Sequence, residues 1–468
     1  MTVVTDPRTG RAERELTPPS QERLRAIVAG LRAAQPSWER SGAEARARAL
    51  REWADAMEAA SGELSAALTA DTGRAYETAL EVSAVIAAAR RWAQAAPGLL
   101  APQPGRSAAV PTVVLETGNR PYQVAGVISP WNFPLLLALI DAIPALAAGS
   151  AVLVKPSEVT PRFIAPLRAT IAAVPALRDV VGVVEGAGET GAVMTGLVDV
   201  LCFTGSVATG RLVAEACARA FIPAFLELGG KDPAIVLPGA DLERASSALL
   251  WGSVANAGQS CQSIERIYAH AEVYEELLRR LVAKAEQVTL ALDGPGAGML
   301  GPLVDPAQAQ VIDEHLADAR ARGARVLTGG RIERHGGGWW VRPTVLADVD
   351  HTMAVMRDET FGPILPVMSA GSVDEAVALA NDSRYGLSGA VFGPEAEAAE
   401  VARRLDVGAV SVNDAGLTAI IHEGEKNSFR ASGLGGSRMG TASLFRFVRK
   451  QTLMINQSHG RDPWWHTP

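Results

Sequence analysis

The stretch VAGVISPWNFPLLLALIDAIPALAAGSAVLVKP, residues 124–156, decides the fold of this chain. Its first and last runs, VAGVIS and AVLVKP, are short and apolar, which predicts two buried strands. The apolar segment 134–148 between them predicts a helix. A helix that connects two buried strands forms the βαβ unit of a parallel sheet. The helix is too short to span a membrane, and it contains Asp141 and Pro144.

The same alternation continues along the chain. Further strands are predicted at 180–184, 198–206 and 222–230, and helices at 160–172 and 206–220. A second alternating region runs from about 230 to 415, with helices near 271–290 and 306–322. The first hundred residues are predicted to be helical, because apolar residues recur there at spacings of three and four, namely Leu50, Trp53, Ala54 and Met57. The predicted fold class is therefore α/β, with parallel sheets.

Local signals add boundaries and one strand pairing. TVVLET and YQVAGVIS, joined by Gly118-Asn119, predict a β-hairpin. The Pro/Gly/Ser-rich stretch 101–111 predicts a break before that hairpin. Ser20 and Ser61 are predicted N-caps, and Gly73 is a predicted helix stop.

Composition excludes several classes of protein. The 468 residues are 48% hydrophobic and 20% charged, an ordinary globular balance that suits two or three domains. The net charge of −7 does not attract nucleic acid or a membrane surface, so neither is an expected partner. Cys202, Cys217 and Cys261 include no close pair, which argues against a disulfide framework and a metal cluster. No apolar run follows the N-terminal charges, so a signal peptide is not expected and a cytoplasmic location is predicted.

Two strand ends point to a nucleotide site. FTGS (203–206) ends a strand and opens a helix, where free N–H groups suit a pyrophosphate. With Gly210 the pattern is Gly-x-x-x-x-Gly, which tight strand–helix packing explains more often. KPSE (155–158) also ends a strand, where ligands of open α/β sheets gather. Lys155 and Glu158 suit the ribose of an adenosine, although the quartet alone is better explained as a solvated loop pair.

Other short motifs carry reactive side chains. Asn132 in PWNFP has the amide of an oxyanion donor, or is a turn asparagine. Glu227 in LELGGKD suits a general base, or is a surface carboxylate. Cys261 in NAGQSCQS lies among small and polar residues and by itself is no more than a thiol. DETFGP places Glu359 and Phe361 before a Gly-Pro turn.

Taken in order, these motifs resemble the aldehyde dehydrogenase superfamily. The set covers nearly the whole chain and consists of PWNFP, KPSE, FTGS with Gly210, LELGGK, GQSC, DETFGP, NDSRYGL (381–387), VSVND (410–414) and SGLG (432–435). Glu227 precedes Cys261 by 34 positions, and Cys261 precedes Glu359 by 98. Both separations are similar to those of the family.

The resemblance implies a role for each motif residue. The implied catalytic residues are the nucleophile Cys261, the oxyanion amide of Asn132 and the base Glu227. The implied cofactor contacts are the adenosine ribose (Lys155, Glu158), the pyrophosphate (Gly205, Ser206), the nicotinamide ribose (Glu359) and the nicotinamide ring (Phe361, Trp131). A carboxylate at position 158 would repel a 2′-phosphate, which favours NAD⁺ over NADP⁺.

The implied reaction is oxidation of a small-molecule aldehyde to a carboxylic acid. The Cys261 thiolate adds to the aldehyde, hydride leaves to the nicotinamide, and Glu227 activates the water that hydrolyses the thioester. Two alternatives stay open, which are acyl transfer to coenzyme A and a catalytically silent protein that keeps the fold. The presence of Glu227 disfavours the first, and the three catalytic positions together disfavour the second.

The chain departs from the family around 425–433. It reads EKNSFRASG where many members read Pro-Phe-Gly-Gly-x-Lys-x-Ser-Gly. In the family this region helps to line the aldehyde tunnel, so the departure concerns substrate choice. His422 in the preceding loop is a candidate substrate contact or proton relay, although a solvated loop histidine is the commoner case.

An apolar wall is predicted next to the oxyanion amide. Phe133, Leu137 and Ile140 follow Asn132 at helical spacing. Such a wall favours an apolar aldehyde, aromatic or medium aliphatic. The same spacing suits simple core packing, and the sequence does not separate the two.

The resemblance also implies the architecture. A nucleotide-binding domain is expected at 1–107 and 124–229, and a catalytic domain at 230–439. A hairpin at 108–123 is expected to pair with the chain after residue 440 as an oligomerisation flap, which would cover a neighbour's sheet edge in a homodimer or homotetramer. The tail QSHGRDPWWHTP, residues 457–468, is expected to pack through its two tryptophans.

Overall fold

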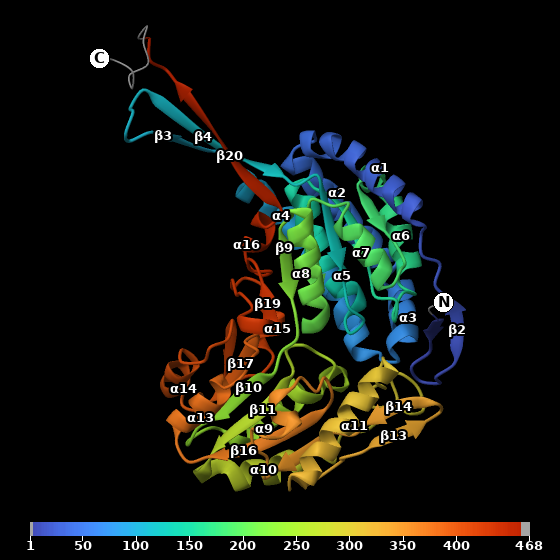
Figure 1. The fold of residues 1–468 in the computed structure, drawn as a ribbon, viewed down its shortest axis with the longest axis vertical. Helices are drawn as coiled ribbons and strands as arrows, with labels where there is room; N and C mark the ends of the chain where they lie inside the picture. Colours follow the sequence, from blue (N-terminus) through green and yellow to red (C-terminus); the bar gives the residue numbers. More distant parts are fainter. Residues whose placement is uncertain (1–2, 460–468) are drawn as a thin grey trace.

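The computed structural model describes residues 3–459 and shows two lobes and a projecting arm (Figure 1). The stretch that predicted the fold forms β5 (Val124–Ile128), α5 (Pro134–Ala148) and β6 (Ala151–Lys155). Strands β5 and β6 pair in parallel, with Val124 opposite Ala151. The α/β prediction is therefore confirmed.

The first sheet has the strand order β19-β9-β8-β5-β6-β7. Its other strands are β7 (Val181–Val183), β8 (Val200–Thr204), β9 (Ala224–Glu227) and the antiparallel β19 (Gly433–Leu434). The helices of this lobe are α1 (Gln21–Arg40), α2 (Ala43–Ala59), α3 (Ser61–Thr72), α4 (Tyr76–Leu100), α6 (Ile164–Ala173), α7 (Gly188–Thr195) and α8 (Val207–Ala220). The chain leaves β5 toward β6 and later returns to β8 on the other side of β5. Ligands of open α/β sheets bind outside the carboxyl ends of the strands at such a reversal.

The second sheet has the order β12-β15-β16-β11-β10-β17-β18. Its strands are β10 (Asp232–Val236), β11 (Ile264–His270), β12 (Arg325–Val326), β15 (Thr344–Ala347), β16 (Ile364–Ala370), β17 (Ser388–Phe392) and β18 (Ala409–Val412). Its helices are α9 (Leu242–Val254), α10 (Ala271–Ala285), α11 (Pro306–Ala321), α12 (Ala354–Arg357), α13 (Val373–Asn381) and α14 (Glu395–Ala402). Alternate residues of β10 enter different cores, with Ala234 and Val236 in one and Ile235 in the other. Both faces of this sheet are therefore buried, which explains the nearly continuous apolar strands.

The projecting arm is an antiparallel sheet of the order β20-β4-β3, built from β3 (Gln103–Arg106), β4 (Val113–Pro121) and β20 (Val448–Asn456) (Figure 1). The predicted hairpin at Gly118-Asn119 is wrong. These two residues lie inside β4, where they pair with Gln451 and Lys450 of β20. The chain turns at 107–112 instead, and the run after β4 enters the first sheet as β5. A distant strand thus supplies the pairing that the sequence assigned to a local turn.

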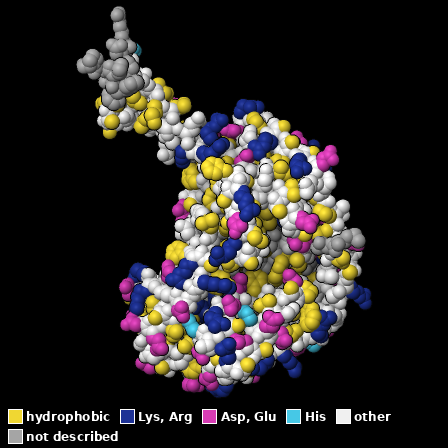
Figure 2. All heavy atoms as spheres, viewed as in Figure 1, with side chains coloured by type: hydrophobic (Ala, Val, Ile, Leu, Met, Phe, Trp, Pro, Cys, Tyr) yellow, Lys and Arg dark blue, Asp and Glu magenta, His cyan; other side chains and the backbone are white. Residues whose placement is uncertain are grey.

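The arm exposes apolar side chains (Figure 2). Leu453, Met454 and Ile455 of β20 are all largely exposed. Strand β20 is also an edge of its sheet within the described chain. Edge strands of this kind pair readily with another chain.

Most of the predicted boundaries hold. Ser20 caps α1 by accepting a hydrogen bond from the Arg23 N–H, and Gly73 ends α3 with a φ of 70°. Ser61 is not a cap, because it is the first residue of α3 and Ala60 holds the N-cap position. The domain boundaries stay a prediction, and most of the tail with its two tryptophans lies outside the described residues.

Smaller elements complete the chain. They are β1 (Val3–Thr5), β2 (Ala12–Glu15), β13 (Ile332–His335), β14 (Gly338–Val341), α15 (Leu417–Ile420), α16 (Ala442–Phe445) and three 3₁₀ turns, η1 (Pro175–Leu177), η2 (Ala255–Gly258) and η3 (Arg430–Ser432). Across residues 3–459, no helix combines the length and the apolar character that crossing a bilayer requires.

A buried charge cluster fixes the segment before β20 onto α5. Asp141 of α5 accepts hydrogen bonds from Arg438 (2.8 Å) and Arg446 (2.5 Å). Burial alone would raise the pKa of Asp141, but the two guanidinium groups outweigh it and lower that pKa. Arg438 also donates to Thr204 at the end of β8.

Asp141→Asn is expected to lower the free energy of unfolding by about 3–5 kcal/mol, because it leaves two guanidinium groups buried without their carboxylate. Urea denaturation followed by circular dichroism measures the effect. The control is Glu243→Gln, which removes the exposed partner of Lys284 and Arg280 and should destabilise the protein far less, because exposed ion pairs contribute little to stability. A similar loss in both variants would contradict the structural role of Asp141.

Candidate active site

The carboxyl ends of the strands of the first sheet face the amino ends of the strands of the second sheet. From the first sheet come Asn132 after β5, Lys155 at the end of β6, Ser206 after β8 and Glu227 at the end of β9. From the second sheet come three residues that precede strands, namely Cys261 before β11 and Glu359 and Phe361 before β16. The chain itself joins the two edges, because β9 continues through Gly229 and Gly230 into β10.

Three contacts join the two sides of this junction. The Asn132 side-chain amide donates to the Gln259 carbonyl at 3.0 Å. The Gly230 N–H donates to the Glu359 carboxylate at 3.0 Å. The Trp131 and Phe361 rings pack edge to face, with their centroids 5.5 Å apart. The predicted catalytic and nicotinamide-side residues therefore gather in one place.

Cys261 follows a tight turn that contains two residues of positive φ and is stabilised by hydrogen bonds of Gln259. Asn256 and Ala257, just before it, have φ values of 55° and 53° in the left-handed region. Gln259 anchors the turn, since its amide donates to the Asn256 carbonyl at 2.9 Å and accepts from the Val304 N–H at 2.8 Å. The thiol is partly buried and free, whereas the other two cysteines are buried in β8 and α8.

The surroundings of Cys261 disfavour its thiolate form. Burial, with the negative charges of Glu359 and Asp232, raises the pKa of Cys261 to about 12. Arg438 acts in the opposite direction, and the charge of Glu227 adds to the increase. A group that accepts the proton or stabilises the thiolate is therefore needed before this cysteine can act as a nucleophile.

A buried ion pair that the sequence analysis missed holds Asn132 in place. Arg74 donates to the Asn132 backbone carbonyl at 2.7 Å and to Glu81 at 2.8 Å. Glu81 in turn accepts hydrogen bonds from the first N–H groups of α5, those of Leu135 (2.6 Å) and Leu136 (2.8 Å). The available signal was a glutamate on the apolar face of helix 76–100, where a charge needs a buried partner.

Asn256 and the Phe133 ring complete that support. The Asn256 amide donates to the same Asn132 carbonyl at 3.0 Å. The Arg74 guanidinium lies 4.7 Å from the centre of the Phe133 ring. Asn132 is thus held through its backbone carbonyl by Arg74 and Asn256, while its side-chain amide binds the Cys261 turn at Gln259.

The predicted adenosine-side residues line the edge of the first sheet. The Lys155 ammonium donates to the carbonyls of Pro156 (2.9 Å) and Gly186 (2.7 Å), and it lies 3.6 Å from Glu158. Burial lowers the pKa of Lys155, and the Glu158 charge opposes that effect. Ser206 caps α8 by accepting from the Thr209 N–H at 3.2 Å, with Gly205 before it. These groups occupy the ends of β6 and β8, which flank β5 on either side.

A second buried ion pair, also missed, shapes the Glu359 turn. Glu265 accepts from the N–H groups of Thr360 and Phe361, both at 2.7 Å, and pairs with Lys231 at 2.6 Å. Burial and the neighbouring Glu265 raise the pKa of Glu359 to about 8. The Phe361 backbone has a φ of 50°, which turns this segment back toward β16.

The Glu227 carboxylate has one hydrogen-bond partner among residues 3–459. The Ser428 hydroxyl donates to its Oε2 at 2.6 Å. Strand β19 pairs with β9, with Gly433 opposite Glu227, so the atypical segment 425–433 lies directly beside this carboxylate. The residues that depart from the family pattern therefore contact the predicted base Glu227.

The predicted apolar wall is only partly exposed. Leu137 is buried, whereas Phe133 and Ile140 are partly buried and lie outside the core cluster that contains their neighbours on α5. His422 is partly buried in the loop after α15, where its Nδ1 lies 3.4 Å from the Met439 sulfur. Within the described chain, His422 makes no hydrogen bond to another predicted site residue.

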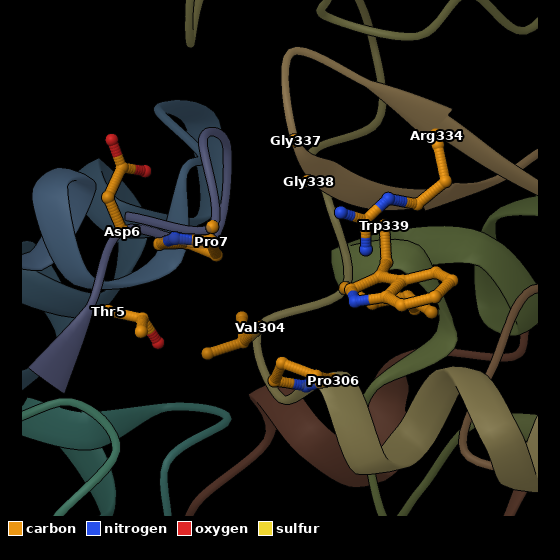
Figure 3. A pocket seen from close by; sticks show the side chains of 11 residues that line it. Thr5, Asp6, Pro7, Val304, Pro306, Arg334, Gly337, Gly338 and Trp339 are labelled. Atoms are coloured by element: carbon orange, nitrogen blue, oxygen red, sulfur yellow. The ribbon is translucent and has the colours of Figure 1, made fainter. Parts of the chain in front are cut away.

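A small pocket beside the N-terminal segment contains none of the predicted site residues (Figure 3). The N-terminal segment lines one side through Thr5, Asp6 and Pro7, and Arg334 stacks 3.9 Å over the Trp339 ring on the other. In residues 3–459, no cluster of three or more acidic, histidine or cysteine side chains is placed to hold a metal ion.

Comparison with known proteins gives one consistent family. Residues 2–453 match the model of the aldehyde dehydrogenase family. A protein of Mycolicibacterium smegmatis assigned as a succinate-semialdehyde dehydrogenase [NADP(+)] is 35% identical over 97% of this chain and 89% of its own. The solved structure of a protein from Anabaena variabilis assigned as the aldehyde dehydrogenase PutA is 52% identical, with a TM-score of 0.97 and coverage of 99% of both chains.

A further solved structure contains a cofactor. It is a betaine aldehyde dehydrogenase mutant of Staphylococcus aureus in complex with NAD⁺. It is 28% identical to this chain, with a TM-score of 0.92, and the match covers 99% of this chain and 96% of that one. A nicotinamide dinucleotide is therefore the cofactor class of the family, while the names of the relatives divide between NAD⁺ and NADP⁺.

Alkylation of Cys261 by iodoacetamide is expected to accelerate about tenfold per pH unit between about pH 7 and 9.5, without a plateau. The reason is that a thiol with a raised pKa gains thiolate in proportion to hydroxide while the pH stays far below that pKa. Mass spectrometry of the labelled peptide gives the rate, and Cys202 and Cys217 serve as internal buried controls. A plateau below pH 9 would show that the resting thiol is already ionised.

Proposed function

The chain belongs to the aldehyde dehydrogenase family, and from that premise we propose that it oxidises an aldehyde to a carboxylic acid with NAD⁺. The observation that carries the proposal is the meeting of Asn132, Glu227 and Cys261 where the two sheets join. The Asn132 amide binds the turn two residues before Cys261, and the Glu227 charge acts on the Cys261 thiol. A thiol, an amide donor and a carboxylate are the groups that covalent aldehyde oxidation needs.

Each of the three residues has one chemical task. The Cys261 sulfur forms a bond to the aldehyde carbon, and the resulting oxyanion accepts a hydrogen bond from the second N–H of the Asn132 amide. Such a donor contributes about 3–4 kcal/mol of transition-state stabilisation. Glu227 accepts a proton from the water that attacks the thioester, which contributes about 10²–10⁴-fold. The C–S bond then breaks and Cys261 is restored.

The residues along the two sheet edges fit a nicotinamide dinucleotide. We assign the pyrophosphate to Gly205 and Ser206 at the N-terminus of α8, and the adenosine ribose to Lys155 and Glu158. The Ser129 hydroxyl, at the end of β5 between these two groups, is buried without a hydrogen-bond partner in the described chain, as expected for a site that a ligand completes. When bound, the nicotinamide supplies the hydride acceptor.

The proposal extends to the nicotinamide side and to the choice of cofactor. Glu359 is assigned to the nicotinamide ribose, and Phe361 and Trp131 to the ring. NAD⁺ is proposed over NADP⁺, because the Glu158 carboxylate at the adenosine ribose would repel a 2′-phosphate.

We propose an apolar substrate, aromatic or medium aliphatic. Phe133 and Ile140 support this class, because they are apolar and only partly buried, and the buried Leu137 lies between them in the sequence. The stretch just before the atypical segment 425–433 adds a second apolar group, since Leu417, Ile420 and Ile421 are exposed there. His422 lies in the same stretch and is proposed to contact the substrate at the rim rather than at the reacting atoms.

We also propose a homodimer or homotetramer. The exposed apolar residues of β20, on an edge strand, support assembly through the arm formed by β3, β4 and β20. A cytoplasmic location is proposed because the three cysteines are free thiols and suit a reducing compartment.

Cys261→Ser is expected to lower NADH production with an aldehyde panel by more than about 10³-fold while NAD⁺ affinity stays nearly unchanged. Glu227→Gln should give a first burst of NADH and then stall, because the thioester forms but is not hydrolysed. Absorbance in the NADH band measures both. Full steady-state turnover of either variant would refute its role.

The same assay separates the two alternative functions. A rate that depends on coenzyme A would favour acyl transfer. If the unmodified protein binds the cofactor but produces no NADH, the catalytically silent alternative is favoured.

Glu158→Ala is expected to reduce the preference for NAD⁺ over NADP⁺ about tenfold, because it removes one negative charge from the ribose site. The measurement is the ratio of kcat/KM for the two cofactors. Glu189→Ala, which removes a carboxylate near the start of α7, is the matched control. An unchanged ratio would show that another residue sets the choice, and a preference of the unmodified protein for NADP⁺ would refute the NAD⁺ proposal.

A further inference from the structure

The atypical segment 425–433 places a hydroxyl on the proposed base. The Ser428 Oγ donates to Glu227 Oε2 at 2.6 Å, the short distance typical of a hydroxyl bound to a carboxylate. The other oxygen, Oε1, accepts no hydrogen bond from residues 3–459. One oxygen is thus held by the protein, and the other remains available to a water molecule.

The same segment brings a partly buried lysine to the junction. Lys426 donates to the Thr418 carbonyl at 2.7 Å and to the Gln262 side-chain oxygen at 3.3 Å, next to Cys261. Both partners are neutral, and among residues 3–459 no carboxylate lies within 4.0 Å of the ammonium.

The charges that act on Lys426 belong to the active site. In order of strength they are Glu227, Cys261 and Asp232, with Arg438 opposing them. Burial lowers the pKa of Lys426, and the three acidic groups counteract that effect. The charged groups that shift the pKa of Cys261 are Glu359, Asp232 and Glu227, which raise it, and Arg438, which lowers it. The ionisable groups that act on Lys426 therefore include the proposed base and the proposed nucleophile.

We propose that Ser428 and Lys426 are positioning residues for the hydrolytic step, an inference that rests on the proposed function. Ser428 fixes the Glu227 carboxylate so that Oε1 faces the attacking water. The water oxygen bonds to the thioester carbon while its proton passes to Oε1. The C–S bond then breaks, its electron pair remains on the Cys261 sulfur, and the Lys426 charge stabilises that thiolate.

The two residues are distinguished by which step each variant slows. Ser428→Ala and Ser428→Gly should leave the rate and size of the first NADH burst within about twofold, because Glu227 acts after oxidation. Breakdown of the acyl-enzyme should slow about tenfold. Lys426→Met should slow both steps at least fivefold, because its charge acts on Cys261 as well as on Glu227. Stopped-flow absorbance gives the burst, and mass spectrometry of acid-quenched samples gives the acyl-enzyme.

Conservative variants and a surface control complete the design. Ser428→Thr and Lys426→Arg keep the hydroxyl and the charge, and should retain at least about a third of each rate. Lys284→Met removes a lysine that is paired with Glu243 on the surface, and should change neither rate. The melting temperature and the NAD⁺ affinity of every variant check that the fold is intact.

The outcomes separate this inference from the proposed function. Acyl-enzyme breakdown that is unchanged or faster in both Ser428 variants overturns the positioning role, as does a loss that affects burst and breakdown equally. A Lys426→Met variant with both rates intact overturns the role of the lysine. If the unmodified protein forms no acyl-enzyme with any aldehyde, the proposed function itself fails.

Discussion

No side chain fits at position 230, where a Cβ would lie 2.2 Å from the Cys261 backbone carbonyl oxygen, and the rest of the site depends on that constraint. A Cβ at Gly229 would displace the carboxylate end of the Glu359 side chain. These two glycines form the link between β9 and β10, so they set how closely the first sheet approaches the second. Because the approach is close, residues at the carboxyl ends of one sheet and the amino ends of the other share a single space.

Buried ion pairs make that junction rigid from both sides. On the first sheet, Glu81 ties Arg74 to the start of α5 and so fixes Asn132. On the second, Glu265 ties Lys231 to the Glu359 turn. In each case a carboxylate satisfies backbone N–H groups as well as a cation, which is the arrangement in which a buried charge is stabilised. The ion pairs thus fix the backbones of Asn132 and of the Glu359 turn, and the side chains of both residues add one hydrogen bond each across the junction.

The sequence predicts the layers of this fold better than its long-range pairings. Alternating apolar runs locate the βαβ unit at 124–156, because strand and helix periodicity are local properties. The Gly118-Asn119 pair misleads for the opposite reason, since the strand that accommodates it, β20, lies more than 300 residues away. The catalytic positions follow from the ordered motifs and their resemblance to a family, because no single motif distinguishes Asn132 or Glu227 from ordinary polar residues. Neither the periodicity nor the motifs predict the contact of Ser428 with Glu227, because this contact depends on the pairing of β19 with β9.

The raised pKa of Cys261 also has a consequence for the lifetime of the protein. Peroxides and other oxidants attack the thiolate form of cysteine, so a thiol that stays protonated at rest resists conversion to sulfenic and sulfinic acids. A cysteine that ionises only during its proposed reaction would therefore survive such oxidants longer than a resting thiolate would.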